Sequence, residues 1–183
     1  LRPWWYRYTP RYKHFSKFEK AVFKPGSMVD ILMFSPIQKK LFQRFYDTES
    51  SRINMLPPGI ARDRCVPANF ADIRECFRKE FELDAGDILL LQIGSGFRTK
   101  GLDRSLRAIS ALPLELRSRT QLYVIGQDDP KEFISLAKSL GISNMVTFFS
   151  GRDDVPRFLQ GADVLLHPSY AENTGGVILE AIV

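Results

Sequence analysis

From about Met28 onward, short apolar or β-branched runs alternate with segments in which apolar residues recur at helical spacing. The run Ile88–Ile93 is apolar at all but one position, which is typical of a parallel strand covered on both faces. Strands are expected at Val29–Phe34, Asn54–Leu56, Ile88–Ile93, Leu122–Ile125, Val146–Phe149 and Val164–Leu166. Helices are expected at Pro36–Tyr46, Asn69–Phe81, Leu102–Leu112, Pro130–Leu140, Val155–Gln160 and from about Gly175. This alternation predicts an α/β fold with a Rossmann-like, doubly wound parallel sheet.

The stretch Pro57-Pro58-Gly59 is stiff and follows an expected strand, so it marks the predicted boundary between two domains. Residues 1–56 are then the tail end of a preceding domain, and residues 57–183 are a Rossmann-like domain. The last expected helix stops on Ala181-Ile182-Val183 without a C-cap signal. We therefore expect a fragment that is truncated at both ends.

The composition excludes several classes of protein. With 44% hydrophobic and 26% charged residues, the 183-residue chain can bury a core and is not a disordered polar chain. It has no apolar run of about 18 residues, the length that a transmembrane helix needs, and its start lacks the layout of a signal peptide. Cys65 and Cys76 are too few for a disulfide framework or a zinc site, so reduced thiols in a cytosolic protein are expected.

The net charge of +5 is concentrated in residues 1–24, which contain seven Lys or Arg against one Glu. The same stretch holds eight aromatic residues: Trp4, Trp5, Tyr6, Tyr8, Tyr12, Phe15, Phe18 and Phe23. Trp and Tyr favour the boundary between headgroups and acyl chains, and each basic residue adds roughly 1 kcal/mol near an anionic leaflet. A membrane-facing segment is favoured, while an aromatic core element and a single-stranded nucleic-acid site stay open.

Glycines follow the most hydrophobic expected strand, in the run Gly94-Ser95-Gly96-Phe97-Arg98-Thr99-Lys100-Gly101. At the carboxyl end of a parallel strand, glycines let backbone N–H groups approach a phosphate, and a lysine adds a point charge. The run is not a P-loop, because Thr99 precedes Lys100, and Thr99 also replaces the third glycine of the dinucleotide fingerprint. A phosphate site and an ordinary tight turn both stay open.

A second polar loop, from His167 to Glu172, follows the last expected strand, and Gly175-Gly176 then opens a helix. N–H groups at a helix N-terminus form a cradle for an anion. Glu172 and Glu180 flank this start at a spacing of eight residues. Glu172 can accept hydrogen bonds from sugar hydroxyls and Glu180 can hold a ribose diol, while ordinary surface or core roles stay open for both and for His167.

The spacing Glu172-x7-Glu180, with Pro168-Ser169 before it and Gly175-Gly176 inside it, resembles the E-x7-E signature of retaining glycosyltransferases of the GT-B fold. Within that family, residues 10–183 are similar to the lipopolysaccharide core glucosyltransferases, which extend inner-core heptose. The supporting runs are Leu56-Pro57-Pro58-Gly59-Ile60, Lys100-Gly101-Leu102-Asp103-Arg104-Ser105, Val124-Ile125-Gly126-Gln127 and Phe149-Ser150-Gly151-Arg152-Asp153-Asp154-Val155. E-x7-E alone is shared by a broad superfamily, whereas the combined set is specific.

The resemblance implies that residues 57–183 bind a UDP-sugar, that the acceptor is a lipid-linked heptose, and that residues 1–24 dock on the cytoplasmic face of the membrane. It implies no metal and no other cofactor. A nucleic-acid partner is not expected, because residues 25–183 are slightly acidic and offer no second basic groove. Carried over by position, Arg64 and Lys100 contact the donor diphosphate, and Glu172 contacts the transferred sugar. The other residues implied at the donor are Gly94, Gly96, Arg98, Gly126, Arg152, Thr174, Gly175, Gly176, Val177 and Glu180.

One departure concerns the residue before Lys100, where the family often has Arg and this chain has Thr99. Arg98 is then the expected substitute for the second diphosphate contact. The implied reaction is a retaining hexosyl transfer in which Arg64, Lys100 and the helix start stabilise the leaving diphosphate. Because the family's complete enzyme is longer, this chain alone is expected to bind nucleotide weakly and not to turn over. The alternatives are a sugar-nucleotide epimerase or phosphorylase of the same fold, and a non-catalytic module that binds anionic membrane or nucleic acid.

Overall fold

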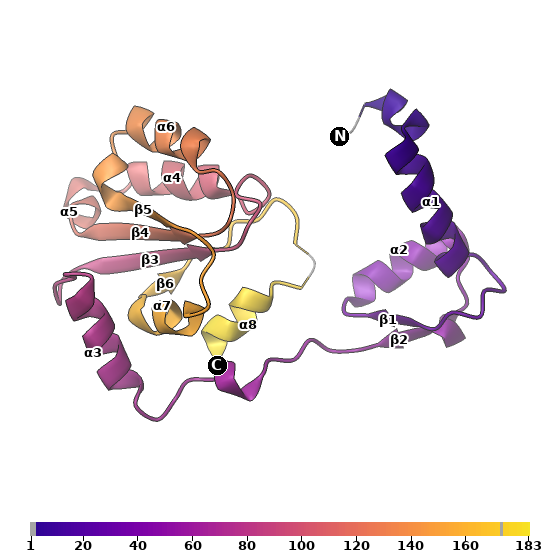
Figure 1. The fold of residues 1–183 in the computed structure, drawn as a ribbon, viewed down its shortest axis with the longest axis horizontal. Helices are drawn as coiled ribbons and strands as arrows, with labels where there is room; N and C mark the ends of the chain where they lie inside the picture. The colour runs from indigo at the N-terminus through magenta and orange to yellow at the C-terminus, as the bar shows by residue number, and fades with distance from the viewer. Residues whose placement is uncertain (1–2, 173) are drawn as a thin grey trace. The chain divides into compact units, whose positions relative to one another are not determined.

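A computed structural model describes residues 3–172 and 174–183 of the chain, so Leu1, Arg2 and Asn173 lie outside the described residues. The chain divides into two units after Gly59, the last residue of the Pro57-Pro58-Gly59 stretch. Each unit contains a parallel sheet, which confirms the predicted α/β class (Figure 1). Among the described residues, no helix combines the length and the apolar character needed to cross a membrane.

The first unit is built on a parallel pair of short strands, β1 (Ile31–Met33) and β2 (Ile53–Met55). Two helices, α1 (Pro10–Phe23) and α2 (Pro36–Tyr46), contribute side chains to its core. The core consists of Ile31, Met33 and Ile53, with Val22, Phe23 and Phe42 packed against them. Short 3-10 helices lie at Trp4–Tyr8 and Ser50–Arg52.

Helix α1 is an element that the sequence pattern does not predict. No residue of α1 is fully buried, and the residues that it contributes to the core, Val22 and Phe23, both lie in its last turn, so no apolar face runs along the helix into the core. Its start is nevertheless well specified, because the Thr9 hydroxyl accepts a hydrogen bond of 3.2 Å from the Tyr12 N–H and Pro10 occupies the first turn.

The second unit contains a four-stranded sheet in the order β5-β4-β3-β6, with all neighbouring pairs parallel. Its strands are β3 (Ile88–Ile93), β4 (Thr120–Ile125), β5 (Val146–Phe149) and β6 (Val164–Leu165). Its helices are α3 (Phe70–Glu80), α4 (Leu102–Ser110), α5 (Leu114–Arg117), α6 (Lys131–Ser139), α7 (Val155–Gly161) and α8 (Gly176–Ile182). A short 3-10 helix lies at Arg62–Arg64 and another at Ser143–Met145.

Both faces of this sheet are covered, which explains the continuous apolar runs in its central strands. Helices α4 and α6 pack on one face and α3 and α7 on the other (Figure 1). Along β3, Leu89 and Leu91 belong to the core under α3 and α7, whereas Leu90 packs with the core under α4 and α6. Gln92 is the polar exception in β3, and its side chain is also buried.

Several predicted boundaries differ from those observed. The expected strand Val29–Phe34 is shorter, Asn54–Leu56 begins one residue earlier, Leu122–Ile125 begins at Thr120, and Val164–Leu166 ends at Leu165. The expected helices Asn69–Phe81, Leu102–Leu112 and Pro130–Leu140 are trimmed at one or both ends, and Val155–Gln160 extends to Gly161. These differences are of the size expected for helix ends and short edge strands, where hydrophobic periodicity carries little information.

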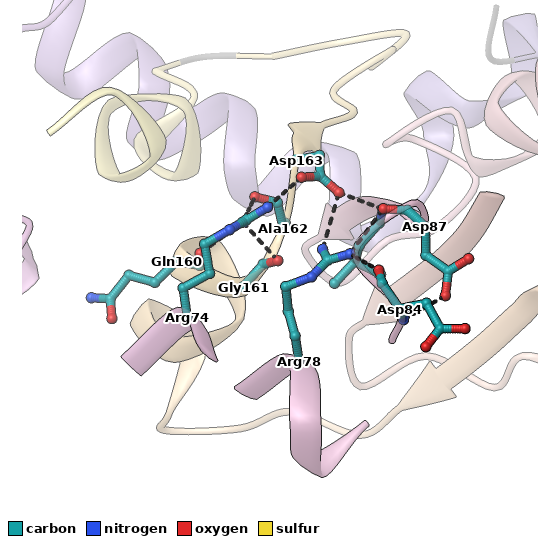
Figure 2. Close-up of polar contacts among 9 residues, drawn as sticks. Arg74, Arg78, Asp84, Asp87, Gln160, Gly161, Ala162 and Asp163 are labelled. Carbon is teal, nitrogen blue, oxygen red and sulfur yellow. Dashed lines mark hydrogen bonds and ion pairs between the residues drawn. The ribbon is translucent and has the colours of Figure 1, made fainter. Parts of the chain in front are cut away.

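The amino end of the second sheet is held by one carboxylate, Asp163, which lies between α7 and β6 (Figure 2). Asp163 pairs with the guanidinium groups of Arg74 and Arg78 from α3 and accepts a hydrogen bond of 2.7 Å from the Leu89 N–H. Arg74 also donates to the carbonyl oxygens of Gln160, Gly161 and Ala162, and Arg78 donates to those of Asp84 and Asp87. This cluster therefore ties α3 to the ends of α7, β6 and β3.

Two opposing effects set the pKa of Asp163. Burial acts to raise the pKa of this carboxyl, but the Leu89 N–H and the charges of Arg74 and Arg78 outweigh burial and hold it below its ordinary value. A group whose pKa is lowered by folding stabilises the protein above its unfolded pKa and loses that contribution as the pH falls.

The substitution Asp163→Asn is therefore expected to destabilise the second unit at neutral pH by about 2 kcal/mol, the order of magnitude for hydrogen bonds to a charged group. The difference from wild type should shrink as the pH falls below about 4, where the carboxylate becomes protonated. Urea unfolding, followed by circular dichroism at a series of pH values, measures the difference in the free energy of unfolding between the variant and wild type. Asp153→Asn, at an exposed carboxylate, is the matched control and should change little. A difference that does not depend on pH would contradict the assignment.

Candidate functional site

The carboxyl ends of the four parallel strands of the second unit meet at one edge of the sheet, where an open α/β fold binds ligands. Two loops at this edge carry the predicted chemistry. One follows β3 and contains residues 94–101, and the other follows β6 and contains residues 166–175. The structure brings these two loops together.

The contact between the loops centres on the carboxylate of Glu172. Its Oε2 atom lies 2.5 Å from Lys100 Nζ, 2.6 Å from His167 Nε2 and 3.4 Å from Ser169 Oγ. Ser169 Oγ is also 3.2 Å from His167 Nε2. The side chains of Lys100, Glu172 and His167 are 23%, 30% and 11% exposed, so this cluster lies at a partly screened surface. A cation, a carboxylate and an imidazole in contact at this edge form a polar site that can bind an anionic or hydroxylated ligand.

Buried hydrogen bonds hold the backbone that carries Lys100. The Gln92 side chain in β3 donates from Nε2 to the Lys100 carbonyl oxygen at 3.0 Å. The Ser105 hydroxyl in α4 donates to Gln92 Oε1 at 2.6 Å. Both side chains are almost fully buried, so the amide of Gln92 has to be satisfied inside the protein. The loop is thereby anchored to strand and helix at once.

Two glycines of the first loop lie where the chain comes close to neighbouring groups. Gly94 has φ of 131° and faces the Lys100 side chain, whose Cε atom would lie 3.2 Å from an added Cβ. Gly101 has φ of 71°, and an added Cβ would collide with the Pro168 carbonyl oxygen. Both backbones therefore adopt conformations that favour glycine and come close to neighbouring groups.

A third loop, after β4, packs against the first. The Asp128 carboxylate accepts a hydrogen bond of 2.7 Å from the Phe97 N–H, and the Ser95 hydroxyl accepts one of 3.1 Å from the Gln127 N–H. At Gly126 an added Cβ would lie 2.5 Å from the Phe97 ring. Gly126 is predicted to bind the ligand, and the close packing shows that a glycine is also required here to leave room for the Phe97 ring.

The loop after β6 is fastened to α4 through Tyr170. The guanidinium carbon of Arg104 lies 3.5 Å from the centre of the Tyr170 ring, and the Tyr170 hydroxyl donates to Asp103 at 2.8 Å. The Tyr170 N–H donates to the Thr99 carbonyl oxygen at 2.8 Å, and Arg104 donates to the Pro168 carbonyl oxygen at 3.1 Å. These contacts hold the loop that carries Glu172 beside the loop that carries Lys100.

Helix α8 begins close after Glu172. Gly175 precedes it with φ of 63°, and among the described residues no side chain caps the helix start. Gly176 is exposed, while Thr174 and Val177 are partly buried. The cap position of α8 therefore offers no side-chain acceptor to the first N–H groups of the helix.

Two other residues that the sequence predicts to bind the UDP-sugar lie apart from the Glu172 cluster. Arg98, 79% exposed, pairs with Glu132 on α6 at 2.7 Å rather than lying beside Lys100. Arg152 forms two hydrogen bonds with Asp154, at 2.7 and 2.8 Å. This pairing raises the pKa of Arg152 and lowers the pKa of Asp154.

Arg64 and Glu180 lie together in a different place. Both line a cavity of about 250 Å³ with residues of α3, α7 and α8. The structure thus brings Arg64, predicted to bind the diphosphate, and Glu180, predicted to bind the ribose, into one cavity. Lys100, His167 and Glu172 do not line that cavity.

Several residues that shape the site are ones that sequence reasoning missed. The Gln92 and Ser105 pair had a usable signal, because Gln92 interrupts an apolar strand and Ser105 lies three residues after Leu102 on the buried face of α4. Asp128 and Tyr170 had no such signal, since their partners are distant in sequence. Within residues 3–172 and 174–183, no group of three or more His, Cys, Asp or Glu side chains is arranged to hold a metal ion.

The chain matches the family described as "Glycosyl transferases group 1" over residues 73–183. It is 45% identical over 177 residues to the lipopolysaccharide glucosyltransferase WaaG of Escherichia coli (strain K12), a match that covers 97% of this chain and 47% of the relative. It is 28% identical over 159 residues to a D-inositol 3-phosphate glycosyltransferase of Mycobacterium sp. (strain KMS), covering 82% of this chain and 34% of the relative. The chain therefore spans about half, or less, of the length of these relatives.

Solved structures give the same picture. The crystal structure of WaaG superposes with a TM-score of 0.93 at 44% identity and covers 99% of this chain and 49% of that structure. The crystal structure of Anabaena Alr3699/HepE in complex with UDP-glucose superposes with a TM-score of 0.72 at 20% identity, covering 86% of this chain and 43% of the other. At that identity the second likeness shows the fold alone.

The buried hydrogen bond under the Lys100 loop gives a prediction about stability. Ser105→Ala leaves the side-chain oxygen of Gln92, Oε1, without its hydrogen-bond donor, which should cost about 1–3 kcal/mol. Ser110→Ala, at a hydroxyl near the end of the same helix, is the control and should cost a few tenths of a kcal/mol, as surface substitutions do. Urea unfolding of both variants measures the difference. Equal effects of the two would mean that the Gln92 amide does not depend on Ser105.

Proposed function

The chain belongs to the group 1 glycosyltransferases, and from that premise we propose that residues 57–183 are the donor-binding part of a retaining hexosyltransferase. The proposed reaction transfers glucose from UDP-glucose to the heptose of the lipopolysaccharide inner core. Its support is the 45% identity to a lipopolysaccharide glucosyltransferase over nearly the whole chain. The observation that carries the proposal is the contact of Lys100 with Glu172 at the carboxyl edge of the parallel sheet.

In this proposal the donor diphosphate lies against Lys100 and the first N–H groups of α8. A lysine ammonium is a strong point charge for a phosphate, and the N-terminus of a helix favours negative charge. Since diphosphate and the Glu172 carboxylate compete for the same ammonium group, donor binding exchanges the Lys100–Glu172 pair for a Lys100–phosphate pair. Glu172 is then available to accept hydrogen bonds from hydroxyl groups of the sugar.

The chemistry that this site supplies is electrostatic. Breaking the bond between sugar and phosphate develops negative charge on the leaving diphosphate, and Lys100 with the α8 N–H groups stabilises that charge. Glu172 positions the sugar rather than acting as an assigned nucleophile. Arg64 and Glu180 belong to the same proposal, with Arg64 on the diphosphate and Glu180 on the ribose.

The supporting roles rest on the resemblance. Gly94 and Gly96 allow the backbone to approach the donor, and Thr174, Gly175, Gly176 and Val177 surround the diphosphate at the start of α8. Gly126 and Arg152 are proposed to line the base. Arg98 reaches the diphosphate only by giving up its pair with Glu132, an exposed contact of small energetic value.

Residues 1–24 are proposed to dock on the anionic, cytoplasmic surface of the membrane, where a lipid-linked acceptor is found. The described part of this segment carries large aromatic side chains in the open: Trp4 is 79% exposed, Tyr8 69% and Phe15 60%. Basic residues lie among them, and the Arg11 guanidinium is 5.8 Å from the Phe15 ring centre. Exposed aromatic rings interleaved with positive charge are the combination that binds an anionic bilayer surface. The segment belongs to the first unit, which we propose is the end of the acceptor-binding domain.

Calorimetric titration of residues 1–183 with UDP tests the donor site. The chain is expected to bind UDP weakly, and Lys100→Ala should reduce the affinity about tenfold or more, because a charged hydrogen bond is lost. The control is Lys131→Ala, which removes a lysine that is 86% exposed and pairs with Asp129 rather than with Glu172. A folded chain without UDP binding, or equal effects of the two variants, would contradict the proposed site.

Co-sedimentation with vesicles that contain phosphatidylglycerol tests the membrane segment. The paired substitution Trp4→Ser and Trp5→Ser should weaken binding about tenfold or more, since burying one large apolar side chain is worth about 1.5–3 kcal/mol. Leu114→Ser, at a side chain of the second unit that is 72% exposed, is the control and should leave binding intact. Competition by DNA that removes the chain from vesicles at every salt concentration would instead favour a nucleic-acid site.

A further inference from the structure

The imidazole of His167 contacts the same carboxylate oxygen as Lys100. His167 Nε2 lies 2.6 Å and Lys100 Nζ 2.5 Å from Glu172 Oε2. The Ser169 hydroxyl is within 3.4 Å of both Glu172 Oε2 and His167 Nε2. Glu172 Oε2 is thus in contact with both the flexible Lys100 ammonium group and the His167 ring. The fold holds these two partners with different firmness.

Lys100 is the movable partner. It has a four-carbon stem whose Cε lies near the backbone of Gly94, and its side chain is 23% exposed. The proposed function draws its ammonium group toward the donor diphosphate. When that happens, the pair between Lys100 and Glu172 has to be given up.

His167 is the fixed partner. Its side chain is 11% exposed, and the residue follows β6 closely, where the Leu166 N–H donates to the Leu91 carbonyl oxygen at 2.7 Å. An imidazole has two side-chain torsions and a rigid ring, so it loses little freedom when it holds a carboxylate. The ring nitrogen therefore stays in place when the lysine is drawn away.

We infer that His167 is a positioning residue that holds the Glu172 carboxylate in place for the transferred sugar after Lys100 has turned to the diphosphate. The inference rests on the proposed function and assigns a residue to it. His167 Nε2 acts as the hydrogen-bond donor, with Ser169 completing the contact. His167 does not touch the donor in this assignment, and it acts through Glu172.

The consequence is a specific effect on the sugar part of the donor. Without an N–H group at position 167, Glu172 loses the hydrogen bond that holds it when Lys100 turns to the diphosphate, and its contacts with the hexose weaken. The affinity for UDP-glucose should then fall more than the affinity for UDP. A residue with a merely structural role would lower both affinities together.

The test compares three substitutions of His167 that differ in whether, and where, they place a hydrogen-bond donor. His167→Gln keeps an amide N–H₂ group at about the reach of Nε2, His167→Asn retracts it, and His167→Met fills the space without a donor. Calorimetry measures the ratio of the dissociation constants of UDP and UDP-glucose for each. Circular dichroism and urea unfolding verify that each variant is folded.

Wild type is expected to bind UDP-glucose more tightly than UDP. The Met and Asn variants should lower this preference about tenfold, as for a lost hydrogen bond to a charged group, and the Gln variant should retain it. In a Glu172→Gln background, His167→Met should have no further effect on the ratio, because the two residues act as one unit.

Three results would overturn the inference: a preference that survives in His167→Met, an equal loss in the Gln variant, or a loss that persists in the Glu172→Gln background. Equal affinities of wild type for UDP and UDP-glucose would also overturn it, since Glu172 would then hold no sugar. A wild-type chain that is folded and binds neither ligand would refute the proposed function itself, and that result is distinct from all the others.

Discussion

The buried amide of Gln92 is the constraint on which the candidate site depends. Its two ends are satisfied by the Lys100 carbonyl oxygen and the Ser105 hydroxyl, so a strand, a loop and a helix share one pair of hydrogen bonds. An unsatisfied amide at this depth costs about 1–3 kcal/mol, which is a large part of the stability of a small domain. The backbone of the Lys100 loop is therefore fixed before any ligand binds, and the Lys100 side chain starts from a defined position.

A second polar cluster holds the opposite edge of the same sheet. Asp163 and its arginine partners tie α3 to the beginning of β3 and β6 (Figure 2). The Gln92 pair fixes the region beyond the end of β3. Between them lies an apolar strand packed on both faces. This arrangement leaves the carboxyl edge as the place where flexible, charged side chains gather, as in other open α/β folds.

The proposed division of labour between the two units follows from the same physical contrast. The second unit buries apolar side chains in two large cores, whereas the first unit exposes aromatic rings along Trp4–Tyr8 and α1. Exposed rings beside positive charges favour a lipid surface, and a sheet edge with a paired lysine and carboxylate favours a charged, hydroxylated ligand. A transferase that acts on a lipid-linked acceptor needs both.

The sequence alone determined the α/β class, because apolar runs such as Ile88–Ile93 and helical periodicity are properties of neighbouring residues in the chain. The elements β3, β5 and α2 have the predicted bounds. It also carried the E-x7-E spacing, and the family match confirms the resemblance built on it. Helix α1 escaped prediction because none of its residues is fully buried and only Val22 and Phe23, in its last turn, pack against the core.

Only the tertiary structure decided which charges meet. Lys100 and Glu172 are 72 residues apart in the sequence, and Arg98 and Glu132 are 34 apart. No local pattern therefore shows that Lys100 joins the Glu172 cluster while Arg98, two residues earlier, pairs elsewhere. The same holds for Arg64, which the structure places with Glu180. Side-chain pairing depends on how strands are ordered and loops are anchored, and these are properties of the folded chain.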